Sequence, residues 1–465
     1  MKITSWSAAL KVDKDSSTNS TAFRTQRFRI AMLSSLGGKT VSIALQLVAL
    51  PIAIAALGID RFGIYAMLTA LLNWMNMAGM AITPGLTVQI VDANSTGARD
   101  AESRVFTTAF LFALMVALCM FLGLQVVFQA VGTLQLIGAT ARPFQEEVGS
   151  GLQILAVLMS LSIVLSTVEG AQAGYQNQYV NNLIGTLGSG LSIVAIVVVV
   201  RQHPTIPSLI LAIYGAPLAA RVLNMLHLFW HRSYLLPWRG HFSIDTLRTM
   251  FATGSAFLLT LLGSFFYQSF SIYWTGHELG AAAAAQMSVM MLVITLSGSI
   301  LITVTQPLWP AIQDAVLRND IAWVENAYRR ILHTLVPYIA LAALALVLGG
   351  QYILDFWLKS GVTINFTTRI LWGLYFFVIA WEHVTYTVLI GFSRFWFASI
   401  PFSIGAVVML VVSVILCSTV GINGIFAALC LGPLSLSAWL FPAEIQRLLK
   451  RVRKDRSSHP ELLSQ

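Results

Sequence analysis

Twelve long apolar stretches follow one another along this chain, separated by short polar segments. A helix of about 20 apolar residues crosses the hydrocarbon core of a bilayer, and a backbone inside that core must satisfy its own hydrogen bonds, which favours helices. We therefore predict an all-α polytopic membrane protein with about 12 transmembrane helices. The predicted spans are residues 33–57, 62–83, 105–131, 149–169, 181–200, 208–230, 250–274, 284–308, 334–350, 369–391, 397–419 and 421–441.

The lysine and arginine residues gather in alternate gaps between these spans. If the N-terminus is cytoplasmic, the cytoplasmic tails and loops hold 21 of the 28 basic residues, and the outer loops hold five. Lys39 and Arg221 lie within spans and account for the remainder. Cytoplasmic loops of membrane proteins carry an excess of basic residues, so we expect both termini to be cytoplasmic.

Composition points to the same class of protein. Hydrophobic residues make up 57% of the chain and charged residues only 10%, and the mean hydropathy is +0.77. The net charge of +9 comes largely from basic tails and inner loops. Such residues set topology and attract anionic lipid, by about 1 kcal/mol per residue near the surface. We expect no nucleic-acid partner.

No pattern in the sequence points to catalysis or to a bound cofactor. Cys119, Cys417 and Cys430 lie inside apolar runs, where cysteine behaves as a small hydrophobe rather than as part of a disulfide framework or metal cluster. Phosphate-binding glycine-rich loops, zinc motifs and Ser/His/Asp arrangements do not occur. We therefore expect a protein that is not an enzyme and uses no cofactor or metal.

Short motifs recur about 220 residues apart. Residues 83–86 (TPGL) end the second predicted span and residues 306–310 (QPLWP) end the eighth, an offset of 223. Residues 174–179 (GYQNQY) follow the fourth span and residues 391–396 (GFSRFW) follow the tenth, an offset of 217. These offsets predict two pseudo-repeated six-helix halves around a central cavity, a recurring design of secondary transporters.

The domain organisation follows from the spans and the repeat. We predict a cytoplasmic N-terminal tail without a signal peptide (1–30), a first six-helix half (31–230), a cytoplasmic linker (231–248), a second six-helix half (249–442) and a basic cytoplasmic tail (443–465). The linker contains Pro237, Trp238 and Gly240 and is expected to act as a hinge strap.

Residues 311–331 show apolar positions at helical spacing with a polar opposite side. We interpret this segment as an amphipathic helix lying in the inner interface. A solvated helical hairpin that extends the eighth span is the alternative.

Polar groups inside predicted spans are the candidate functional residues, because a charge in the middle of a membrane costs several kcal/mol. Glu382 lies near the centre of the tenth span with His383 beside it. This carboxyl either exchanges protons or ions during transport or bonds to a neighbouring helix as a neutral group. A helix–helix contact is the simpler interpretation of His383.

Other polar side chains share helix faces and are candidates for lining a cavity that holds the substrate. They are Lys39, Gln46, Asn73, Asn76, Arg221, Asn224 and Gln268. Snorkelling to the interface is the alternative for the two basic residues; a cavity open to the cytoplasm would instead use them to bind a phosphate-bearing substrate. Glu169, at the inner end of the fourth span, is either a cavity carboxylate or an interface residue, and we favour the interface.

The stretch Leu50–Tyr65 (LPIAIAALGIDRFGIY) resembles the turn between the first two spans of the polysaccharide-type (Wzx-like) flippases. These flippases belong to the multidrug/oligosaccharidyl-lipid/polysaccharide exporter superfamily. Residues 174–177, residues 307–310 and the segment Trp323–Arg330 are also similar to that family. The resemblance extends over nearly the whole chain.

The resemblance implies a V-shaped pair of six-helix halves in a bacterial inner membrane. The cargo would be an undecaprenyl-pyrophosphate-linked oligosaccharide, moved from the inner to the outer leaflet by alternating access for O-antigen, capsule or exopolysaccharide synthesis. Lys39 and Arg221 would hold the pyrophosphate, with Arg24, Arg27 and Arg29 at the mouth of the cavity. Partners would be the lipid-linked oligosaccharide, membrane lipids, and the polysaccharide polymerase and chain-length machinery.

Two rival functions remain at this point. A drug or cation antiporter of the same superfamily would share the fold. A membrane-embedded glycan polymerase would need catalytic groups on a sizeable outer loop, and the longest predicted outer loop, residues 132–148, is short.

Overall fold

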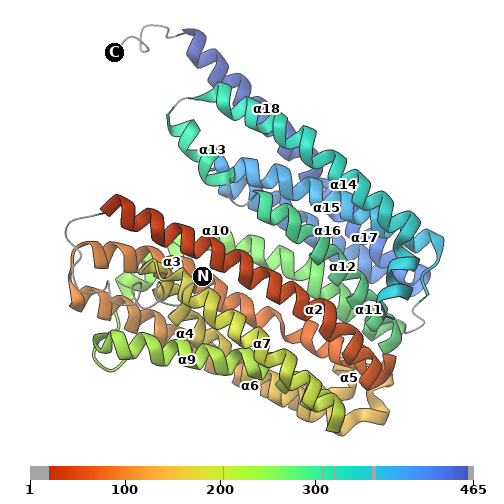
Figure 1. Ribbon diagram of the computed structural model, residues 1–465. Coiled ribbons are helices and arrows are strands. Elements are labelled where there is room, and N and C mark those ends of the chain that lie inside the picture. Colours follow the sequence, from red (N-terminus) through yellow and green to blue (C-terminus); the bar gives the residue numbers. More distant parts are fainter. Residues whose placement is uncertain (1–19, 203, 306–307, 319, 359–362, 459–465) are drawn as a thin grey trace, which may run out of the picture.

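The computed structural model describes residues 20–202, 204–305, 308–318, 320–358 and 363–458 (Figure 1). Side chains are described within these ranges from Val41 onward, with gaps at several positions. Helices account for nearly all of this part of the chain, and no strand occurs in it. The prediction of an all-α protein is confirmed.

The N-terminal half comprises the elements up to His231. They are α2 (Ser20–Leu72), α3 (Trp74–Ser95), α4 (Arg99–Val131), α5 (Thr133–Ile137), the 3-10 segment η2 (Ala139–Phe144), α6 (Gln145–Gly174), α7 (Gln178–Gln202), α8 (Ile206–Ile210), the π-helical turn η3 (Leu211–Gly215) and α9 (Ala216–His231).

A short 3-10 turn, η4 (Ser233–Leu235), lies in the connection to the C-terminal half. That half contains α10 (Ile244–Phe265), the π-helical turn η5 (Phe266–Phe270), α11 (Ser271–Leu279), α12 (Ala281–Thr305), α13 (Leu308–Leu317), α14 (Ile321–Leu358), α15 (Phe366–Gly391), α16 (Phe395–Val420), α17 (Ile422–Ser435) and α18 (Ser437–Ser458).

The described segments include ten helical stretches long and apolar enough to cross a membrane. One of them, Ile43–Ser95, contains two crossings, because α2 bends at Gly58. The pair α10–α11 forms one more crossing through the bundle (Figure 1). Counted in this way, the described helices make twelve crossings, which agrees with the predicted number.

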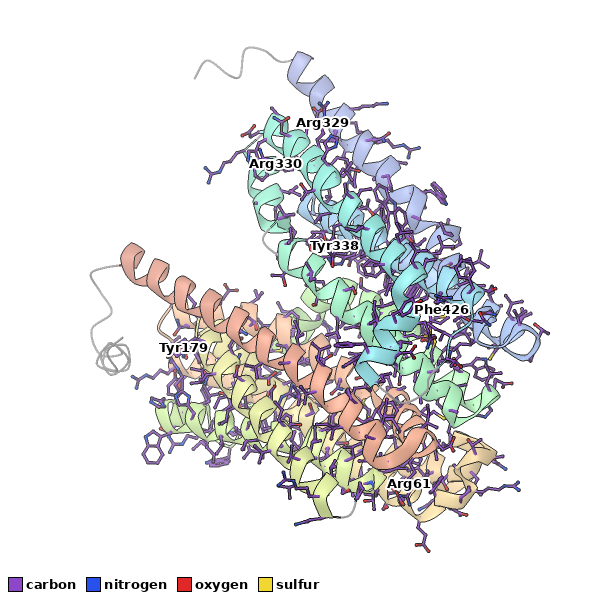
Figure 2. The ribbon with its side chains drawn as sticks, turned by 45° about the vertical axis from the view of Figure 1, so that its right-hand side comes forward. Arg61, Tyr179, Arg329, Arg330, Tyr338 and Phe426 are labelled. Atoms are coloured by element: carbon purple, nitrogen blue, oxygen red, sulfur yellow. The ribbon has the colours of Figure 1, made fainter. Side chains whose placement is uncertain are left out.

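The two halves form two blocks that converge near α5 and α11 and diverge toward the end where α2 begins and α18 ends (Figure 1). Arg329 and Arg330 lie at the diverging end, on the C-terminal half, and Arg61 lies at the opposite end of the molecule (Figure 2). The diverging end therefore carries the start of α2, the end of α18 and the basic pair that the charge pattern assigns to the cytoplasmic side.

One helix extends beyond its predicted span, and one local prediction is corrected. Helix α3 passes through Pro84 and ends at Ser95, so it continues past residue 83, where the second membrane span was predicted to end. Residues 311–331 do not form one interfacial helix: α13 ends at Leu317 and α14 begins at Ile321. The alternative of a helical hairpin that extends the eighth and ninth spans fits this geometry.

The turns that follow α6 and α15 have the same backbone conformation. Gln176 has a φ of 59° and Ser393 a φ of 58°, and no other non-glycine residue in the described chain has a positive φ. This left-handed conformation is uncommon outside glycine. Its occurrence at two positions 217 residues apart supports the internal repeat on structural grounds.

The packing around these two turns also repeats. A Cβ added to Gly174 at the end of α6 would lie 2.6 Å from the side chain of Ile90 in α3. A Cβ added to Gly391 at the end of α15 would lie 2.6 Å from the side chain of Ile312 in α13. Each half therefore brings its second and fourth spans into close contact at the diverging end, at a position that admits only glycine.

The halves touch each other chiefly where α2 packs against α12 and where α3 packs against α10. At the converging end, a Cβ on Gly63 would lie 1.8 Å from the carbonyl oxygen of Ala281. The Tyr273 hydroxyl of α11 donates to the Leu136 carbonyl of α5 at 2.8 Å. These contacts close the end of the molecule opposite to the start of α2 and the end of α18.

Candidate functional site

Each half contains a cavity among its own helices. The N-terminal cavity has a volume of about 490 Å³ and is enclosed by α3, α6, η3 and α9. The C-terminal cavity has a volume of about 280 Å³ and is enclosed by α10, η5, α12, α15 and α16. The polar side chains that line these two cavities are the candidate functional groups.

Arg221 is the basic group of the N-terminal cavity. Its Nε lies 2.9 Å from Oε1 of Glu169, and its Nη1 donates to the hydroxyl of Ser162. Glu169 therefore faces the cavity, which corrects its interpretation as an interface residue. Because the two opposite charges are in contact, the net charge of this cavity is close to zero.

Glu382 is the acidic group of the C-terminal cavity. Its side chain is 1% exposed, and Oε1 accepts a hydrogen bond from the hydroxyl of Ser437. Oε2 has no hydrogen-bond partner among the described atoms, and neither has the nearby Tyr267 hydroxyl. His383 is adjacent to Glu382 and places its Nε2 3.0 Å from the Thr305 hydroxyl.

Five aromatic residues line part of the C-terminal cavity, together with aliphatic and hydroxyl-bearing side chains. The aromatic residues are Tyr267, Tyr375, Phe376, Tyr386 and Phe402. Among the described residues that line this cavity, none is a lysine or an arginine. A buried carboxyl in a cavity that aromatic rings help to line suits a cation with an apolar body, because ring faces attract positive charge.

Three of the predicted amides lie where the halves meet or along the cavities. Gln268 lines the C-terminal cavity, and Asn76 lines the N-terminal one. Asn73 donates from Nδ2 to the Ser269 hydroxyl of the other half at 3.0 Å, and Asn76 donates to Oδ1 of Asn73 at 3.0 Å. Asn73, at the start of α3, thus connects this helix to the seventh span.

The other predicted binding residues have different surroundings. Gln46 is exposed on α2. Asn224 is 1% exposed and donates to Asn181 Oδ1 at 2.9 Å, so its amide is engaged in packing within the half and does not line the cavity beside Arg221. The side chains of Lys39, Arg24, Arg27 and Arg29 lie outside the described residues, although their backbone belongs to α2.

A buried polar cluster at the diverging end was not predicted from the sequence. Oε2 of Glu102, in the first turns of α4, accepts hydrogen bonds at 2.6 Å from the hydroxyls of both Tyr175 and Tyr234. Arg232 donates from Nη1 to the Tyr234 hydroxyl at 2.8 Å, and its guanidinium lies 3.7 Å from the ring centre of Tyr175. Tyr234 and Arg232 belong to the connection between the halves.

Burial raises the pKa of both phenols, and their hydrogen bonds to the carboxylate raise it further. Both tyrosines therefore remain hydroxyl donors at physiological pH. The sequence offered one signal for this cluster. Glu102 is an acidic residue in the first turns of a span, and Tyr175 and Tyr234 lie at helix ends much later in the chain.

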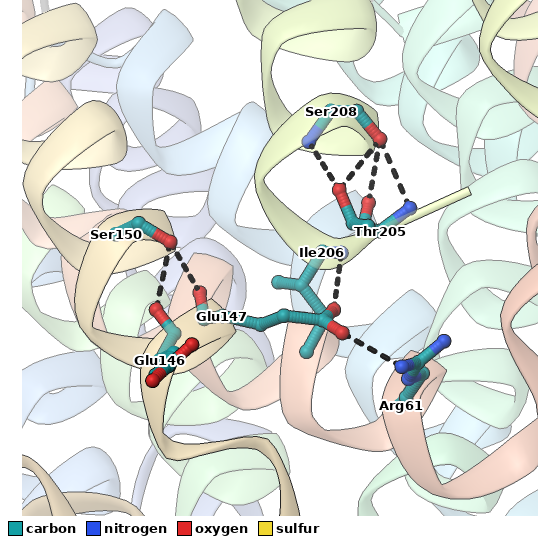
Figure 3. A network of polar contacts seen from close by, with 7 residues as sticks. All are labelled: Arg61, Glu146, Glu147, Ser150, Thr205, Ile206 and Ser208. Carbon is teal, nitrogen blue, oxygen red and sulfur yellow. Dashed lines mark hydrogen bonds and ion pairs between the residues drawn. The ribbon is translucent and has the colours of Figure 1, made fainter. Parts of the chain in front are cut away.

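A second polar network holds the N-terminal half together at the converging end (Figure 3). Arg61 Nη2 lies 2.7 Å from Glu147 Oε1, and the other oxygen of Glu147 accepts from the backbone amide of Ile206 at 3.0 Å. Thr205 and Ser208 cap α8 beside it through reciprocal hydrogen bonds. This network joins α2, α6 and α8.

Among the described side chains, no group of three or more His, Cys, Asp or Glu residues is arranged to hold a metal ion. The chemistry available in the cavities is therefore that of a carboxyl, an arginine–carboxylate pair, hydroxyls and aromatic rings.

Comparison with known proteins identifies the fold. No protein-family model and no curated sequence matches the chain. Among solved structures, the inward-facing conformation of a multidrug resistance MATE family transporter of the MOP superfamily is similar over 88% of this chain and 96% of its own, with a TM-score of 0.75 and 13% identity. The outward-facing conformation of such a transporter has a TM-score of 0.56 and 12% identity over 91% of this chain and 96% of its own.

A MOP superfamily transporter from Pyrococcus furiosus, described as having a binding pocket of reversed polarity, is similar over 91% of this chain and 96% of its own. Its TM-score is 0.56, with 12% identity. At these identities the likeness concerns the fold. The chain thus has the fold of the MATE transporters of the MOP superfamily.

Proposed function

We propose that this protein is a secondary transporter of the MOP type that exports lipophilic cations in exchange for protons. The observation that carries this proposal is Glu382, a buried carboxyl with one oxygen that has no described partner, in a cavity lined in part by aromatic rings. The structural neighbours described as multidrug resistance MATE transporters support the same function.

The physical argument starts from the cost of a buried charge. An unpaired carboxylate inside the membrane costs several kcal/mol, so Glu382 holds either a proton or a cation. A cationic substrate and a proton therefore compete for one group. Alternating access then converts this competition into exchange: the substrate leaves on one side when a proton takes its place.

The N-terminal cavity contributes differently to this proposal. The contact between Arg221 and Glu169 leaves little net charge there to attract a cation or an anion. We assign this pair to holding α6 and α9 in register while the C-terminal cavity exchanges its ligands.

The test is transport of a fluorescent lipophilic cation into proteoliposomes under an imposed pH gradient. The native protein is expected to accumulate the cation and to dissipate the pH gradient at the same time. Glu382→Gln keeps the shape of the side chain but cannot exchange a proton, so both signals should fall to those of empty liposomes. Thr385→Ser, one turn away on α15, is the matched control and should retain both. Proton-coupled transport by Glu382→Gln would refute the proposal.

A second candidate function is the flipping of an undecaprenyl-pyrophosphate-linked oligosaccharide in a bacterial inner membrane. The observation in its favour is the N-terminal part of α2, which carries Arg24, Arg27, Arg29 and Lys39 and has no acidic residue before Asp60. A basic helix at the diverging end suits a pyrophosphate group.

Deletion of the gene separates the two functions. Loss of surface polysaccharide with a build-up of lipid-linked oligosaccharide on the inner leaflet would support the flippase. Normal surface glycan together with increased sensitivity to lipophilic cations would support the antiporter.

A further inference from the structure

The connection between the halves has an unusual position in the fold. We use the name strap for residues 232–243, which join α9 to α10. The Tyr234 carbonyl of the strap accepts a hydrogen bond from the Ser103 hydroxyl at 2.9 Å, and its Ser243 amide donates to the Thr108 hydroxyl at 3.0 Å. Both partners lie on α4, so the strap is fastened along one helix of the N-terminal half.

Close backbone packing accompanies these hydrogen bonds. A Cβ on Gly240 would lie 2.6 Å from the carbonyl oxygen of Ser103, so the strap approaches α4 as closely as a side-chain-free residue allows. The cluster around Glu102 adds the hydroxyl of Tyr234 and the guanidinium of Arg232. The strap therefore moves with the N-terminal half and is not a free loop.

The strap also runs toward the bilayer. Helix α4 begins at Arg99, and Thr108 lies nine residues farther along it. At about 1.5 Å of rise per residue, the end of the strap is roughly 13 Å inward from the start of the helix. A segment that folds back over this distance lies beside the first turns of a membrane span, at the level of the lipid headgroups.

The exposed charged and large side chains of the strap and its flanks are mostly aromatic or basic, and Asp245 is an exposed acidic one. Trp238 is 76% exposed, and Trp230, just before the strap, is 88% exposed. Phe242 and Arg239 are exposed beside them, and Arg248 is exposed at the start of α10. Tryptophan is enriched at membrane interfaces, and basic residues near the surface attract anionic lipid.

We propose that the strap and its flanking residues form a binding surface for anionic phospholipids, in the leaflet on the side where α2 begins and α18 ends. The aromatic rings enter the headgroup region while Arg239 and Arg248 contact the phosphate groups. Anionic lipid would thereby hold the N-terminal half at a fixed depth. This inference does not depend on which substrate the protein carries.

The first test measures the depth of the strap. A nitroxide is attached to Trp238→Cys in a Cys119→Ser background, because Cys119 is exposed whereas Cys417 and Cys430 are buried. In lipid nanodiscs, oxygen should quench this label more strongly than a water-soluble nickel chelate. Labels at Ser95→Cys and Leu122→Cys give the water-exposed and lipid-exposed limits. A label at position 238 as accessible to nickel as the one at position 95 would overturn the proposal and leave the surface available to a soluble protein partner.

The second test measures lipid preference. Native mass spectrometry compares retained phosphatidylglycerol with phosphatidylcholine after extraction from equimolar nanodiscs. Arg239→Gln with Arg248→Gln should lower the ratio by roughly fivefold for each residue, and replacement of both by lysine should preserve it. Arg142→Gln with Arg201→Gln removes the same charge elsewhere and should leave the ratio unchanged. Equal losses from both glutamine pairs would mean that only net charge matters and would refute a specific surface.

Discussion

The N-terminal cavity holds an arginine in contact with a glutamate, whereas the C-terminal cavity holds a glutamate whose described partner is a hydroxyl. The two halves share the number of crossings and the turns at Gln176 and Ser393. A duplicated scaffold can therefore keep its backbone while its two cavities differ in charge. The half with the paired charges is suited to structural stability, and the half with the lone carboxyl is suited to exchange.

The largest effect is expected when the N-terminal ion pair is broken. Arg221→Ala leaves Glu169 without its cation, and the free energy of unfolding should fall by about 2 kcal/mol, between the values for exposed and fully buried pairs. Chemical unfolding in nanodiscs measures the change. In a double-mutant cycle with Glu169→Gln, the losses should not add; simple additivity would show that the two side chains do not interact energetically.

A glycine contact beside the C-terminal cavity should have the next largest effect. A Cβ on Gly405 would lie 2.7 Å from both the Gly432 carbonyl oxygen and the Tyr267 hydroxyl. Gly405→Ala is therefore expected to lower stability by about 1–2 kcal/mol through overpacking.

Gly298 lines the same cavity and has no atom within 4 Å of an added Cβ. Gly298→Ala is the matched control and should raise stability by about 0.5 kcal/mol through helix propensity. A loss of similar size in both variants would contradict the assigned cause.

Replacement of the lone carboxyl, Glu382, should increase stability, whereas breaking the Arg221–Glu169 pair should decrease it. Glu382→Gln removes the need to keep a carboxyl neutral inside the protein. The free energy of unfolding near neutral pH should therefore increase by about 1 kcal/mol, and the unfolding temperature should rise with it. Glu169→Gln should lower it, because Arg221 loses its partner. Thermal unfolding of the two variants side by side gives the comparison, and a decrease in both would remove the contrast between the cavities.

The cluster at Glu102 distinguishes the halves in a smaller way. Tyr175 occupies the position that Phe392 occupies in the C-terminal half, 217 residues later. Tyr175→Phe makes the two turns alike and removes one of the two hydroxyl donors to Glu102, at a cost of about 1 kcal/mol. Phe392→Tyr is the reciprocal variant and should bring no gain, because the Tyr175 hydroxyl donates to the Glu102 carboxylate and no such acceptor is described beside Phe392.

The smallest effect is expected at alkaline pH. The pKa values of Tyr175 and Tyr234 are raised in the folded protein by burial, so their contribution to stability is complete below about pH 10, the unfolded value, and declines as the pH rises above it. Unfolding temperatures measured between about pH 9 and 11 follow this decline. The double variant Tyr175→Phe, Tyr234→Phe should show a shallower decline than the native protein.

The sequence was a good guide to where the helices are and a poorer guide to where they end. Hydropathy reports where the chain leaves the hydrocarbon, which is not where a helix must stop. Helix α3 continues through Pro84, and hydroxyls bond to carbonyls on both sides of it: Thr83 donates to the Gly79 carbonyl at 2.8 Å, and Thr87 to the Thr83 carbonyl at 2.9 Å. Local bonding of this kind is invisible to a pattern of apolar residues.

The candidate site was predictable only in part. Glu382 could be singled out because a carboxyl in the middle of an apolar span is costly wherever it points. The partner of Arg221 could not, because Glu169 lies on another helix, and their meeting depends on how α6 and α9 are rotated against each other. The same holds for Asn224, whose shared face with Arg221 did not place it on the cavity.

The strap has a consequence for the order in which the protein assembles during synthesis. Its partners Glu102, Ser103, Thr108 and Tyr175 all precede it in the chain. The N-terminal half can therefore lock its connection in place before the seventh span emerges from the ribosome, in keeping with N-terminal-first folding. The C-terminal cavity must wait for Ser437 in the last helix, so it is the final part of the protein to mature.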